Sequence, residues 1–84
     1  MAKVKIYTTQ YCPFCSRVKS LFKSKGIEVE EIDVTYDPEM RQKLSDQTGW
    51  MTVPMVFIGD QFIGGYDDAR SLDEQGKLDP LISG

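Results

Sequence analysis

The sequence has 84 residues, of which 40% are hydrophobic and 27% charged, so we expect one folded domain over residues 1–84 rather than a disordered chain. A net charge of −3 without a cluster of Lys and Arg argues against nucleic-acid binding. No apolar run reaches the roughly 18 residues of a membrane helix, and no signal peptide precedes the first predicted strand, so we expect a cytoplasmic protein.

The first two elements follow from their apolar spacing. Residues 3–8 alternate polar and apolar side chains, which predicts a strand. Residues 13–25 carry apolar side chains at helical spacing. Pro13 stands at the first helical position and Gly26 just beyond the last one, as is typical of helix ends.

A second strand and a second helix come next. Residues 27–34 are rich in β-branched side chains, and the change of parity between Val29 and Ile32 suggests a bend or bulge there. Asp37 followed by proline is typical of a helix start. Gly49 is expected to end that helix.

The last third of the chain predicts a hairpin and a helix. Residues 53–58 form a strand with Pro54 near its entry, and a Gly-Asp turn leads into a strand over 61–63. A last helix opens at Tyr66. The remaining apolar side chains are expected to fold back onto the core: Leu78, Leu81 and Ile82.

The predicted order is therefore β-α-β-α-β-β-α. The first β-α-β unit should be a right-handed parallel crossover, and the hairpin adds an antiparallel pair. This predicts an α/β fold with a mixed sheet of four strands flanked by three helices.

The chain has two cysteines, in Cys12-Pro13-Phe14-Cys15, and no histidine. The missing histidine excludes a Cys–His nucleophile pair, and two cysteines alone do not complete a zinc site. A structural disulfide is disfavoured because so short a loop constrains the unfolded chain least.

The spacing of the two cysteines fits redox chemistry instead. Side chains three apart on a helix are near the span that a disulfide needs. The helix N-terminus favours a thiolate, so we expect exposed Cys12 to be the nucleophile and Cys15, inside the helix, to be the resolving thiol. Two merely buried cysteines are the less favoured interpretation, and half of a metal site, completed by another chain or a ligand, is the main rival.

Two further motifs have both a functional and a structural interpretation. In Thr52-Val53-Pro54, the proline indicates either a cis bond or an ordinary strand start. The glycines of residues 64–68, Gly-Gly-Tyr-Asp-Asp, permit close approach of a ligand whose carboxylate would meet the following helix start; equally, they are turn glycines before capping aspartates. Trp50 and Met51 are compatible with core packing or with a surface contact.

Together these three motifs resemble the dithiol glutaredoxins over nearly the whole chain. The resemblance implies a thioredoxin-like fold with sheet order 2-1-3-4 and a cis peptide before Pro54. It also implies reduction of protein disulfides and glutathione mixed disulfides, with glutathione as co-substrate and no metal. The implied partners are glutathione and disulfide or glutathionylated proteins, without nucleic acid or membrane, and the protein is expected to be a monomer.

The resemblance assigns roles to individual residues. Cys12 and Cys15 are the implied catalytic pair. Glutathione is expected to contact the Val53 backbone with its cysteinyl part and Asp67 and Asp68 with its γ-glutamyl end. The full set of implied glutathione-binding residues is Tyr11, Phe14, Thr52, Val53, Pro54, Gly65, Tyr66, Asp67 and Asp68.

This sequence departs from the family pattern at three positions. Thr9 and Met51 stand where many relatives have Lys and Arg, so weaker glutathione binding is a hypothesis. Phe14 stands where Tyr is commoner. Two alternatives stay open: a thioredoxin-like redoxin reduced by a flavoprotein reductase, which the missing cations slightly favour, and a glutathione-assisted iron–sulfur carrier, which Pro13 disfavours.

Overall fold

The computed structural model describes residues 3–83. Met1 and Ala2, which precede the first predicted strand and bear on the expected lack of a signal peptide, lie outside the described residues. None of the helices within residues 3–83 is long and apolar enough to cross a membrane. The elements, in chain order, are β1 (Val4–Thr8), α1 (Pro13–Ser24), β2 (Val29–Asp33), α2 (Pro38–Thr48), β3 (Met55–Ile58), β4 (Gln61–Gly64), α3 (Tyr66–Glu74) and α4 (Leu78–Ser83).

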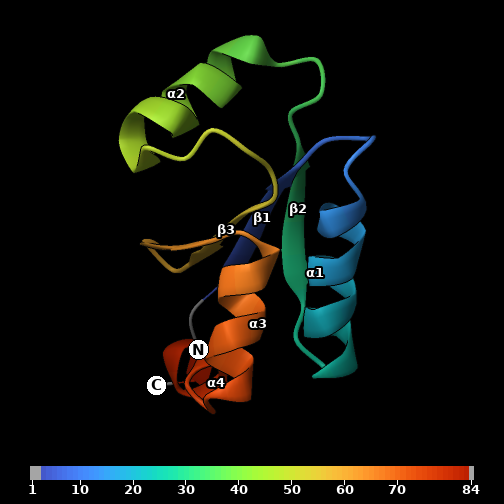
Figure 1. Ribbon diagram of the computed structural model, residues 1–84, viewed down its shortest axis with the longest axis vertical. Coiled ribbons are helices and arrows are strands. Elements are labelled where there is room, and N and C mark those ends of the chain that lie inside the picture. The colour runs from blue at the N-terminus through green and yellow to red at the C-terminus, as the bar shows by residue number, and fades with distance from the viewer. Residues whose placement is uncertain (1–2, 84) are drawn as a thin grey trace.

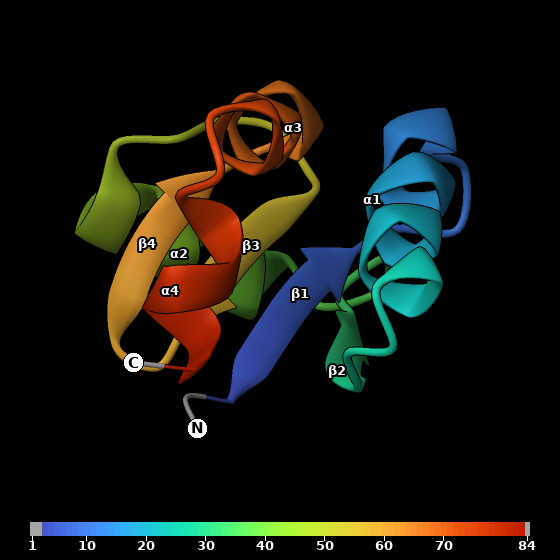
Figure 2. The same ribbon diagram turned by 90° about the horizontal axis from the view of Figure 1, so that it is seen from below.

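The four strands form one mixed sheet in the order β2-β1-β3-β4 (Figure 1). β1 pairs in parallel with β2, while β3 is antiparallel to both β1 and β4. Figure 2 shows α1 and α3 together over the sheet, and Figure 1 places α2 apart from them. The α/β class, the thioredoxin-like fold and the sheet order 2-1-3-4 are confirmed.

The core lies between the sheet and the helices α1, α3 and α4. Phe22 is its largest fully buried side chain, at 0% exposure, and comes from the last turn of α1. The other members of this cluster are Val4, Ile6, Val18, Val56, Ile58, Ala69, Leu78 and Ile82. Packing the apolar stripe of α1 onto β1 and β3 fixes the position of the loop that joins β1 to α1.

The expectation of three helices is wrong, because residues 78–83 form a fourth. Leu78 and Ile82 do fold back onto the core, at 0% and 3% exposure. They are four residues apart, so one helical turn puts both on the same face. Pro80 is compatible with this helix because it lies in the first turn, where a backbone N–H has no intrahelical partner.

Of the bend or bulge expected between Val29 and Ile32 in the second strand, the bulge is wrong. The described β2 pairs with β1 residue by residue, from Val4 opposite Val29 to Thr8 opposite Asp33. The irregularity lies instead between Val56 and Phe57, where β3 meets β4. β2 is an edge strand with both faces partly exposed, so its side chains need not alternate strictly.

Candidate active site

Cys12 lies at the point where the β1–α1 loop enters the helix. Its backbone is extended, and its Sγ accepts a hydrogen bond from the Cys15 N–H at 3.3 Å. Cys12 is therefore the N-cap of α1, and Pro13 is the first helical residue, as the sequence predicts. A sulfur in this position faces the positive end of the helix dipole, which stabilises a thiolate.

The two sulfurs differ in their surroundings. Both cysteines are free thiols; Cys12 is half-buried, whereas Cys15 is 2% exposed. The Cys12 thiol donates to the carbonyl oxygen of Val53 at 3.4 Å. An incoming disulfide can therefore approach Cys12 and not Cys15.

The pKa of the Cys15 thiol is raised to about 12, chiefly by burial and then by its hydrogen bond with Cys12. Cys15 therefore stays protonated at neutral pH. Because only a thiolate attacks a disulfide efficiently, the surroundings of Cys15 keep it inactive until its proton is removed.

The loop before β3 provides the other side of the site. The Val53–Pro54 peptide bond is cis, as the resemblance implies, and Pro54 is buried. The strand itself begins at Met55 rather than at residue 53. Val53 therefore belongs to the loop, with its carbonyl directed at Cys12.

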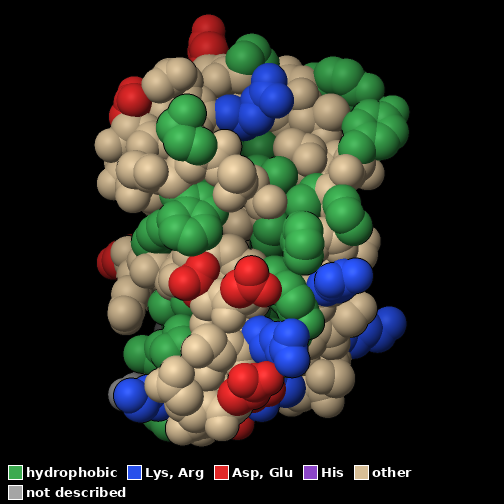
Figure 3. Space-filling view, viewed as in Figure 1, with side chains coloured by type: hydrophobic (Ala, Val, Ile, Leu, Met, Phe, Trp, Pro, Cys, Tyr) green, Lys and Arg blue, Asp and Glu red, His purple; other side chains and the backbone are tan. Residues whose placement is uncertain are grey.

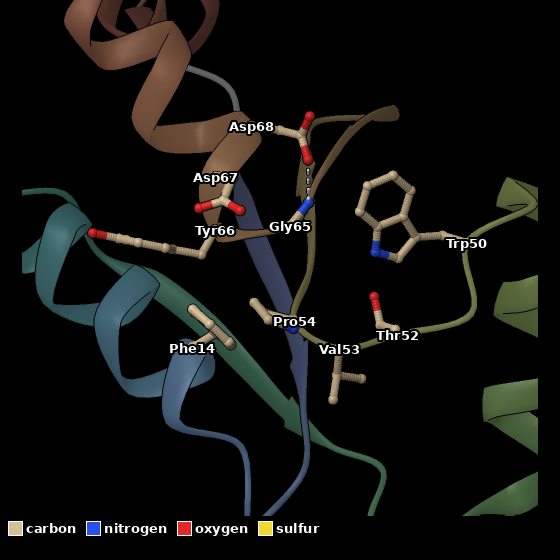
Figure 4. A pocket seen from close by; sticks show the side chains of 9 residues that line it. All are labelled: Phe14, Trp50, Thr52, Val53, Pro54, Gly65, Tyr66, Asp67 and Asp68. Atoms are coloured by element: carbon tan, nitrogen blue, oxygen red, sulfur yellow. Dashed lines mark hydrogen bonds between the residues drawn. The ribbon is translucent and has the colours of Figure 1, made fainter.

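A cleft of about 350 Å³ opens beside this loop. Figure 4 shows Phe14 and Tyr66 on one side and Trp50 and Thr52 on the other, with Pro54 and Gly65 between them. The rings of Phe14 and Tyr66 lie 6.2 Å apart, and the Arg17 guanidinium lies 5.2 Å from the centre of the Phe14 ring. The cleft thus has aromatic walls from three separate segments of the chain.

The N-terminus of α3 closes one end of the cleft. Gly65 is the N-cap, and its N–H donates to the Asp68 carboxylate at 3.0 Å. Gly64 has φ of +121°, and a Cβ on it would lie 2.5 Å from Asp68 Oδ2. Glycine is required at this position, and Asp68 orders the turn while the first N–H groups of α3 remain for a ligand.

Comparisons with known proteins agree with this geometry. The family model described as Glutaredoxin matches residues 4–63. The chain is 45% identical to a glutaredoxin of Pseudomonas aeruginosa over 83 residues, covering 99% of each protein. It is 44% identical to glutaredoxin 3 of Escherichia coli strain K12 over 82 residues, covering 98% of this chain and 99% of the relative. The chain belongs to the glutaredoxin family.

Solved glutaredoxin structures share the fold closely. A crystal structure of a buckwheat glutaredoxin–glutathione complex superposes with a TM-score of 0.93 at 34% identity, covering 98% of this chain and 77% of that one. A solution structure of glutaredoxin from Brucella melitensis gives 0.87 at 44% identity, covering 98% and 89%. This chain is thus a dithiol glutaredoxin, a glutathione-dependent thiol–disulfide oxidoreductase with a C-x-x-C pair.

The structure brings together most of the residues that the glutaredoxin resemblance names for glutathione. All of them except Tyr11 line the cleft. Tyr11, which directly precedes Cys12 in the chain, is 85% exposed and does not line the cleft. Of the two residues that the sequence left undecided, Trp50 lines the cleft, whereas Met51 is 83% exposed and does not.

Proposed function

We propose that this glutaredoxin reduces glutathione mixed disulfides and protein disulfides through the thiolate of Cys12, with glutathione as the electron donor. The observation that carries the proposal is the placement of Cys12 Sγ, which caps α1 and lies 3.4 Å from the Val53 carbonyl beside the cleft. A glutathione sulfur at that point would meet the nucleophile while the rest of the tripeptide occupied the cleft.

On a glutathionylated protein, the Cys12 thiolate attacks the glutathione sulfur. A new disulfide forms between Cys12 and glutathione, and the protein leaves as a thiolate that takes up a proton. A second glutathione thiolate then attacks the bound glutathione sulfur. This step releases oxidised glutathione and restores the Cys12 thiolate, so Cys15 is not needed.

On a protein disulfide, Cys12 first forms a mixed disulfide with the protein. Cys15 then loses its proton and attacks Cys12 Sγ, which releases the reduced protein and leaves a disulfide between Cys12 and Cys15. Two glutathione molecules reduce this disulfide and leave as oxidised glutathione. The buried position of Cys15 supports a role limited to this intramolecular step.

We place the cysteinyl part of glutathione against the Val53 backbone and its γ-glutamyl end at Asp67 and Asp68. The shape of the cleft supports this placement, as does the existence of a glutathione complex of the similar buckwheat protein. The remaining proposed contacts are Phe14, Thr52, Pro54, Gly65 and Tyr66, together with Tyr11, which lies outside the cleft lining.

We also propose that residues 1–84 act as one monomeric domain in the cytosol, where thiols stay reduced.

Glutathione binding should improve when a cation is restored at residue 9. Thr9 lies just after β1, and its backbone is within hydrogen-bonding reach of the Cys15 sulfur. A charge-assisted contact to the glycine carboxylate is worth about 1.5–3 kcal/mol, so Thr9→Lys should lower the KM for glutathione about tenfold. Met51→Arg should change it less, because Met51 lies outside the cleft. Steady-state kinetics at varied glutathione would measure both, and an unchanged KM in Thr9→Lys would remove this explanation.

The proposal is tested by a coupled assay with glutathione, glutathione reductase and a glutathione mixed disulfide. Cys12→Ser should be inactive, and Cys15→Ser should keep its activity on this substrate while losing it on a protein disulfide. Equal loss in both variants on the mixed disulfide would refute the monothiol route. Efficient reduction by a flavoprotein reductase without glutathione would favour the redoxin alternative.

A further inference from the structure

Trp50 carries an unusual polar atom. Among the described residues, its indole Nε1 is a buried side-chain donor with no hydrogen-bond partner. Native structures contain few such groups, because an unpaired buried donor has lost its water without gaining an acceptor. Nothing in the proposed mechanism uses this nitrogen.

The indole is part of the cleft wall next to α3. Its ring packs edge-on against Phe62, with ring centres 5.7 Å apart. A Cβ on Gly65 would lie 3.5 Å from Trp50 Cζ2 and 3.9 Å from Nε1. Figure 4 shows the nitrogen edge of the ring turned toward Gly65 and Pro54, away from α2. The unpaired donor therefore lies beside the N-cap of α3.

The hydrogen-bond donors at this end of the cleft, from Trp50 and the first turn of α3, favour an anion with several acceptor atoms. The first turn of α3 leaves backbone N–H groups unpaired, and an indole N–H donates without accepting. The residues that line the described cleft include no Lys or Arg but two carboxylates, Asp67 and Asp68, of which Asp68 already accepts a hydrogen bond from the Gly65 N–H. A carboxylate bound here would be held by neutral donors alone.

We infer that Trp50 is a specificity-determining residue, whose indole N–H donates to the α-carboxylate of the γ-glutamyl group of glutathione. The inference rests on the proposed glutathione-dependent function and adds a residue to its binding site. Because Nε1 is shielded in the free protein, the ring turns as the carboxylate enters. The gain of a partner for an unpaired donor favours that movement.

The chain has a single tryptophan, so one indole N–H signal reports the contact directly by NMR. Cys15→Ser protein labelled with ¹⁵N would be converted to mixed disulfides of Cys12 with glutathione, γ-glutamylcysteine or cysteinylglycine. We expect the indole signal to move downfield with glutathione and with γ-glutamylcysteine, and to stay near its free position with cysteinylglycine. A shift with cysteinylglycine, or none with γ-glutamylcysteine, would overturn the inference.

Kinetics provide an independent readout. Trp50→Phe keeps an aromatic ring against Phe62 and removes the N–H. It should raise the KM for a glutathione mixed disulfide about tenfold, with kcat nearly unchanged, because a hydrogen bond to a charged group is lost. The KM for the mixed disulfide of cysteinylglycine, which lacks the γ-glutamyl group and its α-carboxylate, should not rise. An equal rise for both substrates would indicate a structural role only and would overturn the inference.

Experiment can distinguish a failure of the proposed function from a failure of the role inferred for Trp50. Absence of glutathione-dependent turnover in the unmodified protein would refute the proposed function, and this inference with it. Normal turnover together with an unmoved indole signal would refute the role of Trp50 alone.

Discussion

At the scale of single residues, the position of each sulfur relative to the first turn of α1 decides its role. Cys12 precedes the hydrogen-bonded part of the helix and is half-buried, whereas Cys15 faces the core. The same backbone hydrogen bond that caps the helix, from Cys15 N–H to Cys12 Sγ, therefore stabilises charge on one sulfur only. Local geometry thus gives two identical side chains different exposure and hydrogen bonding, and the difference in reactivity that we propose follows from these.

The raised pKa of Cys15 predicts a pH dependence of stability. Its pKa is about 12 when folded, against an ordinary value of 9.0. Above pH 9 the unfolded chain loses this proton while the folded chain keeps it, so the free energy of unfolding falls as the pH rises toward 12. Urea denaturation of the reduced protein between pH 8 and 11 should show a steeper fall for the native sequence than for Cys15→Ser. Parallel curves would contradict the assigned pKa.

The C-x-x-C motif and Pro54 were easier to predict from the sequence than the residues that line the cleft. The N-cap position of Cys12, the place of Cys15 inside the helix and the cis peptide before Pro54 could be predicted because helix capping, helix spacing and proline chemistry are local effects. Trp50 and Met51 are neighbours in an irregular loop, where no periodicity tells which side chain faces inward. Only the packing of Trp50 against Phe62 decides that it lines the cleft.

At the scale of elements, the junction of β4 and α3 depends on one glycine. Gly64→Ala combines a left-handed backbone with a contact of 2.5 Å to the Asp68 carboxylate. We expect it to destabilise the fold by more than the about 1–2 kcal/mol of the backbone strain alone and to weaken glutathione binding. Gly26→Ala is the matched control, since Gly26 has φ of +72° with open space around it. Equal losses in urea denaturation would show that the Asp68 contact is unimportant.

Lys25 connects three helices at the end of the molecule away from Cys12. Its ammonium group, at the C-cap of α1, pairs with Asp73 on α3 and, at 3.3 Å, with Asp79 on α4. The hydrogen bond with Asp73 is the main cause of its raised pKa. The resulting stabilisation is present below pH 10.5 and is lost as the pH rises through the folded pKa.

Lys25→Met should therefore lower the free energy of unfolding at pH 7 and leave less difference from the native protein above pH 11. Arg70→Met is the control, because Arg70 and Glu74 form an exposed pair within α3, with side chains 59% and 64% accessible. Such pairs contribute about 0.3–0.5 kcal/mol. If urea denaturation gave Lys25→Met the same small effect, the three-helix contact would not stabilise the fold.

Most boundaries of the helices could be predicted from the sequence because capping residues mark them. Asp37 caps α2 through a hydrogen bond from Met40 N–H at 3.0 Å, and Gly49 ends it with φ of +73°. The fourth helix could not be predicted in the same way. It has six residues, and its two buried side chains form a helical turn only because α3 and the sheet provide a surface for them.

At the scale of the whole molecule, a small core must hold the site loops in place. Phe22 is fully buried at its centre, and truncating it to Ala should cost about 3–5 kcal/mol. That is a large share of the about 5–15 kcal/mol that stabilises a typical domain. Urea denaturation should show a much lower midpoint, whereas Tyr36→Ala, at a site 82% exposed, should remain within about 0.5 kcal/mol of the native protein. A small effect of Phe22→Ala would mean that this core is not where the stability resides.

We propose that Cys12 is the one cysteine of this chain that undergoes thiol–disulfide exchange with glutathione. Mass spectrometry of digested Cys15→Ser protein, after brief reaction with oxidised glutathione near pH 7, tests it most directly. We expect one glutathione adduct, on the peptide that contains Cys12, and no adduct on Cys12→Ser protein treated in the same way. An adduct on Cys15 in the Cys12→Ser protein, formed as fast as that on Cys12, would contradict it.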